Sequence, residues 1–161
     1  MLFSSTPSER SVLGRFLRLL PGLWAGILLC VALLATPAPF ALLAQADAAR
    51  VVARILSHEA YTSLALGVVL LGLERLAARQ SAGAGLASQF SFGMVLCLGA
   101  LFCTVAGYFA LQPLMAPARA GQGPLSFSQL HALSAAFYIV KTGLVLALAW
   151  RAAGPGASLQ A

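Results

Sequence analysis

The sequence has little charge and few chemically reactive side chains. Charged residues make up 9% of its 161 residues and hydrophobic residues 60%, whereas soluble globular domains carry about 25% charged and roughly 45–50% apolar residues. Only four residues are acidic, one is lysine and two are histidine. A water-soluble enzyme or binding domain is therefore excluded, because its surface would need many more charged side chains.

The sequence also lacks the common motifs of catalysis and ligand binding. It has no phosphate-binding loop, hydrolase nucleophile elbow or paired-carboxylate site. The three cysteines (Cys30, Cys97 and Cys103) lie inside apolar runs without Cys-x-x-Cys spacing, so we interpret them as small apolar residues. The basic residues flank apolar runs and do not alternate with exposed aromatics, so no nucleic-acid partner is expected. Nothing here indicates an enzyme.

What the sequence does contain is four long apolar runs. An α-helix needs about 20 residues to cross a hydrocarbon core of roughly 30 Å, and each run reaches or approaches that length. The runs extend over about Leu19–Ala38, Ala60–Leu73 (with a start as early as Ser57 or His58), Phe90–Met115 and Ser126–Trp150. They are unbroken and do not alternate as strands would, and they show no convincing internal sequence repeat. We predict an all-α integral membrane four-helix bundle.

The stretch between the first two runs, Phe40–Leu56, mixes apolar side chains with Asp47, Arg50 and Arg54. It follows two prolines that end or kink the first helix. An amphipathic segment at the membrane interface is predicted here, and a solvated connector fits the same pattern. The single transmembrane domain would cover residues 19–151, with tails at 1–18 and 152–161.

The arginines favour one orientation of this bundle. With four spans, both termini share one side of the membrane with the loop between the second and third spans. That side holds Arg10, Arg15, Arg18, Arg75, Arg79 and Arg151, and the opposite side holds Arg50, Arg54 and Arg119. Because arginine is enriched on the cytoplasmic side, we expect both termini in the cytoplasm.

The last apolar run carries a polar stripe. Its members recur at spacings of three and four and so share one helix face: His131, Ser134, Tyr138, Lys141 and Thr142. Ionisable groups at membrane depth are costly and usually functional. Glu74 comes to a similar depth and is the predicted ion-pair partner of Lys141. The alternative is that Lys141 snorkels to the interface while Glu74 pairs with Arg75 or solvent.

His58 and His131 form a second candidate site. Both fall near the outer ends of helices that run inward, and neutral imidazole is a common metal ligand. Their spacing fits no zinc motif, but two axial imidazoles could hold haem b, or they could bind copper. No cofactor is predicted, with haem or copper as the alternative.

Several short motifs resemble those of a known family. They are Trp24-Ala25-Gly26, Thr36-Pro37-Ala38-Pro39-Phe40, His58-Glu59-Ala60-Tyr61, Gln112-Pro113-Leu114-Met115 and Phe127 to Ser134. Together they resemble a bacterial membrane family of unknown function that is related to the eukaryotic transmembrane protein 205. The resemblance implies a four-span protein of the bacterial inner membrane, with no established activity and no catalytic residues to transfer.

A more distant likeness is to small four-helix membrane proteins of the CopD copper-resistance and HemJ protoporphyrinogen-oxidase kinds. Lys141 would correspond to the lysine on their last helix. The HemJ pattern also has a histidine near the start of its first helix, and this sequence has none there, which argues against haem chemistry.

Two functions follow as hypotheses. The first is a non-enzymatic membrane protein that handles a small solute, or that assembles in the lipid bilayer with itself or with another membrane protein, through the stripe around Tyr138 and Lys141. The alternative is a haem- or copper-binding oxidoreductase-like membrane protein that uses His58 and His131.

Overall fold

The computed structural model describes residues 7–83 and 91–154, and all regular structure in these two ranges is helical. The elements, with η marking π-helical segments, are α1 (Pro7–Cys30), η1 (Val31–Ala35), α2 (Pro37–Leu42), α3 (Gln45–Gly83), α4 (Phe92–Thr104), η2 (Val105–Ala110), α5 (Gln112–Arg119) and α6 (Phe127–Ala153).

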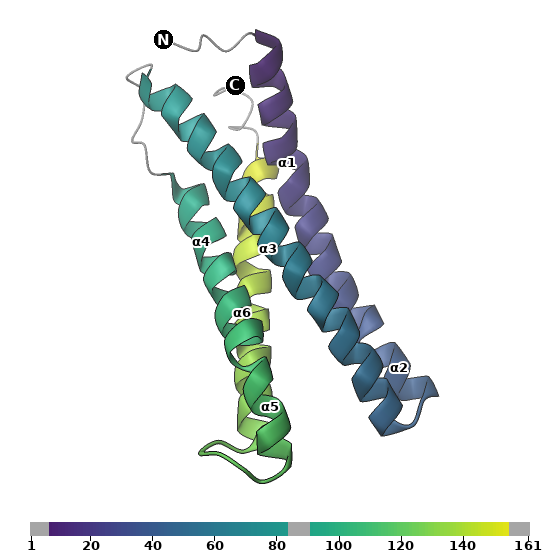
Figure 1. The fold of residues 1–161 in the computed structure, drawn as a ribbon. Coiled ribbons are helices and arrows are strands. Elements are labelled where there is room, and N and C mark those ends of the chain that lie inside the picture. Colours follow the sequence, from purple (N-terminus) through teal and green to yellow (C-terminus); the bar gives the residue numbers. More distant parts are fainter. Residues whose placement is uncertain (1–6, 84–90, 155–161) are drawn as a thin grey trace.

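These elements form four rods that are long and apolar enough to cross a membrane. The rods cover Val12–Leu42, Gln45–Gln80, Phe92–Arg119 and Phe127–Ala153. Both α1 and α4 pack against α3 and against α6, so α3 and α6 face each other across a diagonal. The start of α1 and the end of α6 lie at the same end of the bundle (Figure 1). The predicted all-α four-helix membrane bundle is confirmed.

The outer surface of the bundle is made of large apolar side chains. Leu19, Leu33, Ile139 and Trp150 are each at least two-thirds exposed. A water-soluble protein would bury such residues, whereas a lipid environment solvates them. The buried apolar core is small and centres on Trp24 and its neighbours in α3, α4 and α6.

Two of the four rods change helical geometry along their length. The first rod changes from α to π geometry at η1 and continues as α2, and the third changes at η2 and continues as α5. In both rods a proline occupies the first turn of the continuing helix, Pro37 in α2 and Pro113 in α5. Proline lacks the amide donor of a helical hydrogen bond. π-helical turns are rare in proteins overall, and those that occur are often at functional sites.

The second rod differs most from its predicted bounds. The segment after the first span is not a separate interfacial helix: Pro37–Leu42 forms α2, and α3 begins at Gln45 and runs without a break to Gly83. No glycine or proline interrupts residues 45–66, so nothing separates the polar start from the apolar run. Between the predicted second and third spans the chain stays helical as far as Gly83, and residues 84–90 lie outside the described residues.

Gly107 in η2 provides a test of this packing. A Cβ at this position would lie 2.6 Å from Cβ of Phe137 in α6, and that atom cannot move without the α6 backbone. We expect Gly107→Ala to lower stability by about 1–3 kcal/mol. Gly143 has open space around it, so Gly143→Ala is the control and should leave the melting temperature in detergent unchanged or slightly raised. Equal melting temperatures for the two variants would contradict the packing described.

Candidate functional site: a buried charged centre

The middle of the bundle holds an ion pair between α3 and α6. Nζ of Lys141 donates to Oε1 of Glu59 at 2.7 Å, and the two side chains are only 4% and 3% exposed. Helix α6 brings Lys141 inward because that side of the helix is occupied by Leu130, Val145 and Leu148, which are all buried. The pair therefore lies in the protein interior and does not face the lipid.

Two further side chains extend this pair to α1. The Ser63 hydroxyl, one turn after Glu59 on α3, donates to Oε1 of Glu59 at 2.5 Å. The same hydroxyl oxygen accepts from Nε1 of Trp24, which is fully buried in α1, at 2.9 Å. Oε1 of Glu59 thus accepts from both an ammonium and a hydroxyl, and the indole fixes the orientation of that hydroxyl.

Tyr138 supports the ammonium from the other side. The Lys141 nitrogen lies 4.6 Å from the centroid of the Tyr138 ring, a cation–π distance. The Tyr138 hydroxyl donates to the backbone carbonyl of Leu28 in α1 at 2.9 Å, and Thr142 donates to the carbonyl of Tyr138 at 2.8 Å. We use the term buried centre for Trp24, Glu59, Ser63, Tyr138 and Lys141.

The buried centre lies several turns from the start of both helices that carry its charges. Glu59 is fourteen residues after Gln45, where α3 begins, and Lys141 is fourteen residues after Phe127, where α6 begins. At 1.5 Å per residue both charges are roughly 21 Å along their helices. Lys141 is thus close to the midpoint of α6, which has 27 residues, and Glu59 lies in the first half of α3, which has 39.

A second ion pair lies near the end of the bundle where α1 begins and α6 ends. Nη2 of Arg151 donates to Oε1 of Glu74 at 2.6 Å, and the hydroxyl of Ser91 donates to Oε2 of the same carboxylate at 2.8 Å. Arg151 is 40% exposed and Glu74 12%. We call Glu74, Ser91 and Arg151 the clasp, because together they join α3, the start of α4 and α6.

A model of a protein family matches much of the chain. The model is described as a domain of unknown function, DUF4149, and it matches residues 19–124. The chain belongs to the DUF4149 family. No curated protein and no solved structure matches it. The matched range of DUF4149 includes Trp24, Glu59 and Ser63 of the buried centre but ends before α6, so Lys141 contributes from outside it.

In this DUF4149 protein the partner predicted for Lys141 is wrong. Lys141 pairs with Glu59, and Glu74 pairs with Arg151. The error came from beginning the second span near His58, which placed Glu59 at an interface and Glu74 at the depth of Lys141. Because α3 begins at Gln45, Glu59 lies well inside the helix, opposite Lys141, and Glu74 lies near the end of the bundle where α6 ends.

The predicted stripe on α6 divides between interior and surface. Lys141 is buried, and Tyr138, Ser134 and Thr142 are half-buried. His131 is exposed and stacks on the ring of Phe127, with ring centroids 5.9 Å apart. Tyr138 and Lys141 of the stripe therefore belong to the buried centre, and His131 does not.

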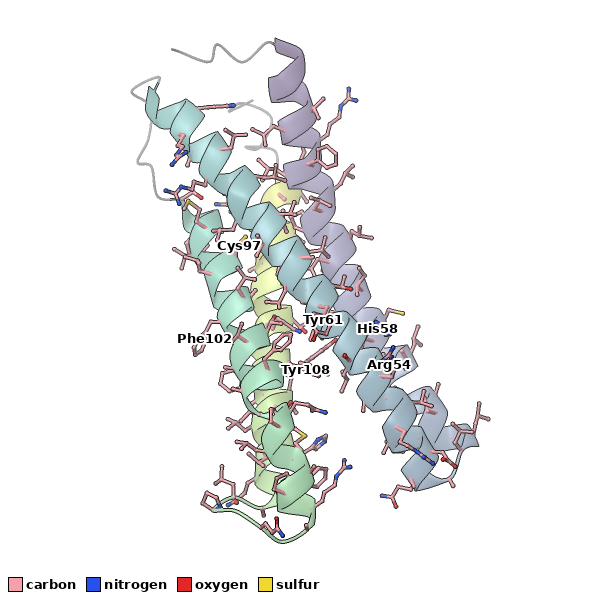
Figure 2. The ribbon with its side chains drawn as sticks, viewed as in Figure 1. Arg54, His58, Tyr61, Cys97, Phe102 and Tyr108 are labelled. Atoms are coloured by element: carbon pink, nitrogen blue, oxygen red, sulfur yellow. The ribbon has the colours of Figure 1, made fainter. Side chains whose placement is uncertain are left out.

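The predicted histidine site is not assembled around the buried centre. His58 is exposed on the lower part of α3 (Figure 2), and His131 is exposed near the start of α6. Among residues 7–83 and 91–154, no group of three or more His, Cys, Asp and Glu side chains is placed to hold a metal ion. A haem or copper role for the two histidines stays a prediction.

Sequence reasoning missed Glu59, Ser63 and Trp24 as members of one site. The signal that could have found Glu59 is the scarcity of acids, because the chain has only four and a lysine at mid-membrane needs one of them. Trp24 and Ser63 gave no such signal, since their role depends on which faces of α1 and α3 meet.

Removing one partner of the buried pair should destabilise the protein far more than removing both. Lys141→Met leaves the Glu59 carboxylate without its partner, so we expect a loss of about 3–5 kcal/mol. The double variant Glu59→Leu with Lys141→Met removes both charges and should recover most of that loss. Unfolding free energies in detergent would measure these effects.

The control is Arg50→Met, which breaks the exposed Arg50–Asp47 pair on α3 and should cost less than about 1 kcal/mol. A loss at Lys141 no larger than the loss at Arg50, or no recovery in the double variant, would argue against a coupled buried pair.

Proposed function

We propose that this DUF4149 protein is a non-enzymatic, multi-pass protein of the bacterial inner membrane that handles a small solute at the buried centre, and that the solute is the proton. The observation that carries the proposal is the Lys141–Glu59 pair, in contact at 2.7 Å and almost fully buried in the interior of the bundle. Placing each charge at this depth costs on the order of 2.5–3.5 kcal/mol on insertion scales, and such residues typically mark ion or proton pathways.

The chemistry of the pair suits a proton better than a larger solute. An ammonium in contact with a carboxylate can pass one proton to it, which leaves a neutral amine and a neutral carboxylic acid. A proton that arrives from one side is then balanced by one that leaves from the other, and the pair returns to its starting state. In the charged form of the pair, the hydroxyl of Ser63 contacts the Glu59 carboxylate and the ring of Tyr138 contacts the Lys141 ammonium.

The hydrogen bonds of the Lys141 ammonium leave it able to exchange a proton. In the described residues every deeply buried side-chain nitrogen and oxygen has a hydrogen-bond partner. Lys141 has three N–H donors, and one of them is used by Glu59. The ammonium thus has remaining capacity to donate to a transient acceptor such as water.

Transport can be tested with the full chain in sealed vesicles of phosphatidylethanolamine and phosphatidylglycerol that contain a pH-sensitive dye. Under an imposed membrane potential we expect proton uptake at least tenfold above that of protein-free vesicles. Glu59→Gln and Lys141→Met should each reduce the uptake at least tenfold, because either change removes a group that must bind the proton.

The matched control is Asp47→Asn, which alters an exposed acid on the same helix and should leave the uptake unchanged. Uptake equal to that of empty vesicles, or full uptake in folded Glu59→Gln protein, would refute a proton-handling role.

The proposed orientation places both termini in the cytoplasm. Among residues 12–80 and 91–154, whose side chains the structure describes, it is supported by five arginines at the end of the bundle where α1 begins and α6 ends, against three at the other end: Arg15, Arg18, Arg75, Arg79 and Arg151, against Arg50, Arg54 and Arg119. We expect a cysteine introduced at exposed Gln122, between α5 and α6, to react in intact cells with a thiol reagent that cannot cross the membrane. A cysteine at exposed Arg79 should react only after lysis, and the reverse pattern would overturn the orientation.

A further inference from the structure

The two halves of the chain repeat one architecture. Each half begins with an α-helix that passes into a π segment, continues as a short helix with proline in its first turn, and is followed by a long unbroken helix. In the first half these elements are α1, η1, α2 and α3, and in the second half α4, η2, α5 and α6. In both halves the chain runs from one end of the bundle to the other and back, so α1 and α4 share one direction and α3 and α6 the opposite one (Figure 1).

The buried pair relates the two halves. Glu59 and Lys141 occupy the same position in their long helices, fourteen residues from the start of each. Helices α3 and α6 lie diagonally in the bundle and pack against α1 and α4, not along each other. Long side chains therefore bridge the diagonal, and the charges meet where the two repeats meet. Repeat interfaces at mid-membrane are where transporters with broken helices bind their ions.

The two ends of the bundle differ. Where α1 begins and α6 ends, the clasp joins the halves through Glu74, Ser91 and Arg151. Gly93 makes room for it, because a Cβ there would collide with the Arg151 guanidinium and the Glu74 carboxyl group. At the other end η1 and α2 pack against α3, while η2 and α5 pack against α6. The two sets of helices diverge towards that end (Figure 1).

We propose that the clasp is a gate: the two repeats move relative to each other about the buried centre, and the clasp closes the end of the bundle where α1 begins and α6 ends. The inference rests on the proposed function, because it assigns to the clasp the regulation of access to the Glu59–Lys141 site. In this motion the π segments and the prolines that follow them would be the points at which the first and third rods bend.

The chain contains its own reporter of gate opening. Cys97 lies one turn after Gly93 on α4, in the upper part of that helix (Figure 2), and it is fully buried. With Cys30→Ala and Cys103→Ala in the background, Cys97 is the only thiol. It can react with a charged, water-soluble methanethiosulfonate reagent only when water reaches the space behind the clasp.

The experiment measures the rate of Cys97 modification in lipid nanodiscs, in which both faces of the protein are accessible. We expect Glu74→Gln and Arg151→Gln to raise the rate at least tenfold. The exchanged pair Glu74→Arg with Arg151→Glu should lower it again towards the rate of the parent protein. Arg75→Gln, which alters the exposed neighbour of Glu74, is the matched control and should have no effect.

Each variant is first checked for a monodisperse profile in size-exclusion chromatography. Folded Glu74→Gln protein with an unchanged rate would overturn the gate, and so would single and exchanged variants that react equally fast.

Cys97 modification is measured without any proton flux, so the gate and the proposed solute are tested separately. Fast modification in Glu74→Gln together with no proton uptake by the unaltered chain would leave the gate standing and remove the proposed solute. Proton uptake that depends on Glu59, together with unreactive Cys97 in every variant, would support the proton as the solute and overturn the gate.

Discussion

The Glu59–Lys141 ion pair is the interaction on which the rest of the bundle depends. Neither charge is tolerable alone at this depth, because each would lose its hydration without gaining a partner. The contact at 2.7 Å therefore fixes the register of α3 against α6, and a slip of one helical turn, about 5.4 Å, would break it. Trp24 and Tyr138 then attach α1 to the same point.

In lipid the hydrophobic effect contributes little to contacts between helices, so the other helix contacts of this bundle need another source of stability. Acyl chains are as apolar as leucine, so helices associate through close packing and polar contacts. Gly67 lets Leu101 of α4 and Trp24 of α1 approach α3. Gly107 lets Phe137 of α6 approach η2. Small residues thus bring the helices close enough for a few polar side chains to meet.

The sequence was sufficient to predict the four spans and to identify Lys141, because both follow from local composition. It was not sufficient to identify Glu59, since the depth of that residue depends on where α3 begins. The polar stretch before Leu56 looked like a separate interfacial segment, yet no glycine or proline lies between Gln45 and Leu66, and the helix continues through it. The distribution of two acids between two basic partners is likewise a property of helix pairing, which local patterns do not encode.

The contrast between the two ion pairs explains why one should open and the other persist. Arg151 is 40% exposed, so its guanidinium can exchange Glu74 for water or a lipid headgroup at small cost, whereas Lys141 at 4% has no such alternative. Gly93 leaves room for this outer pair, because a Cβ at that position would collide with the Arg151 guanidinium and the Glu74 carboxyl group. In the proposed gate, the more exposed pair at the end of the bundle is therefore the one that separates, and the central pair remains in contact as the pivot.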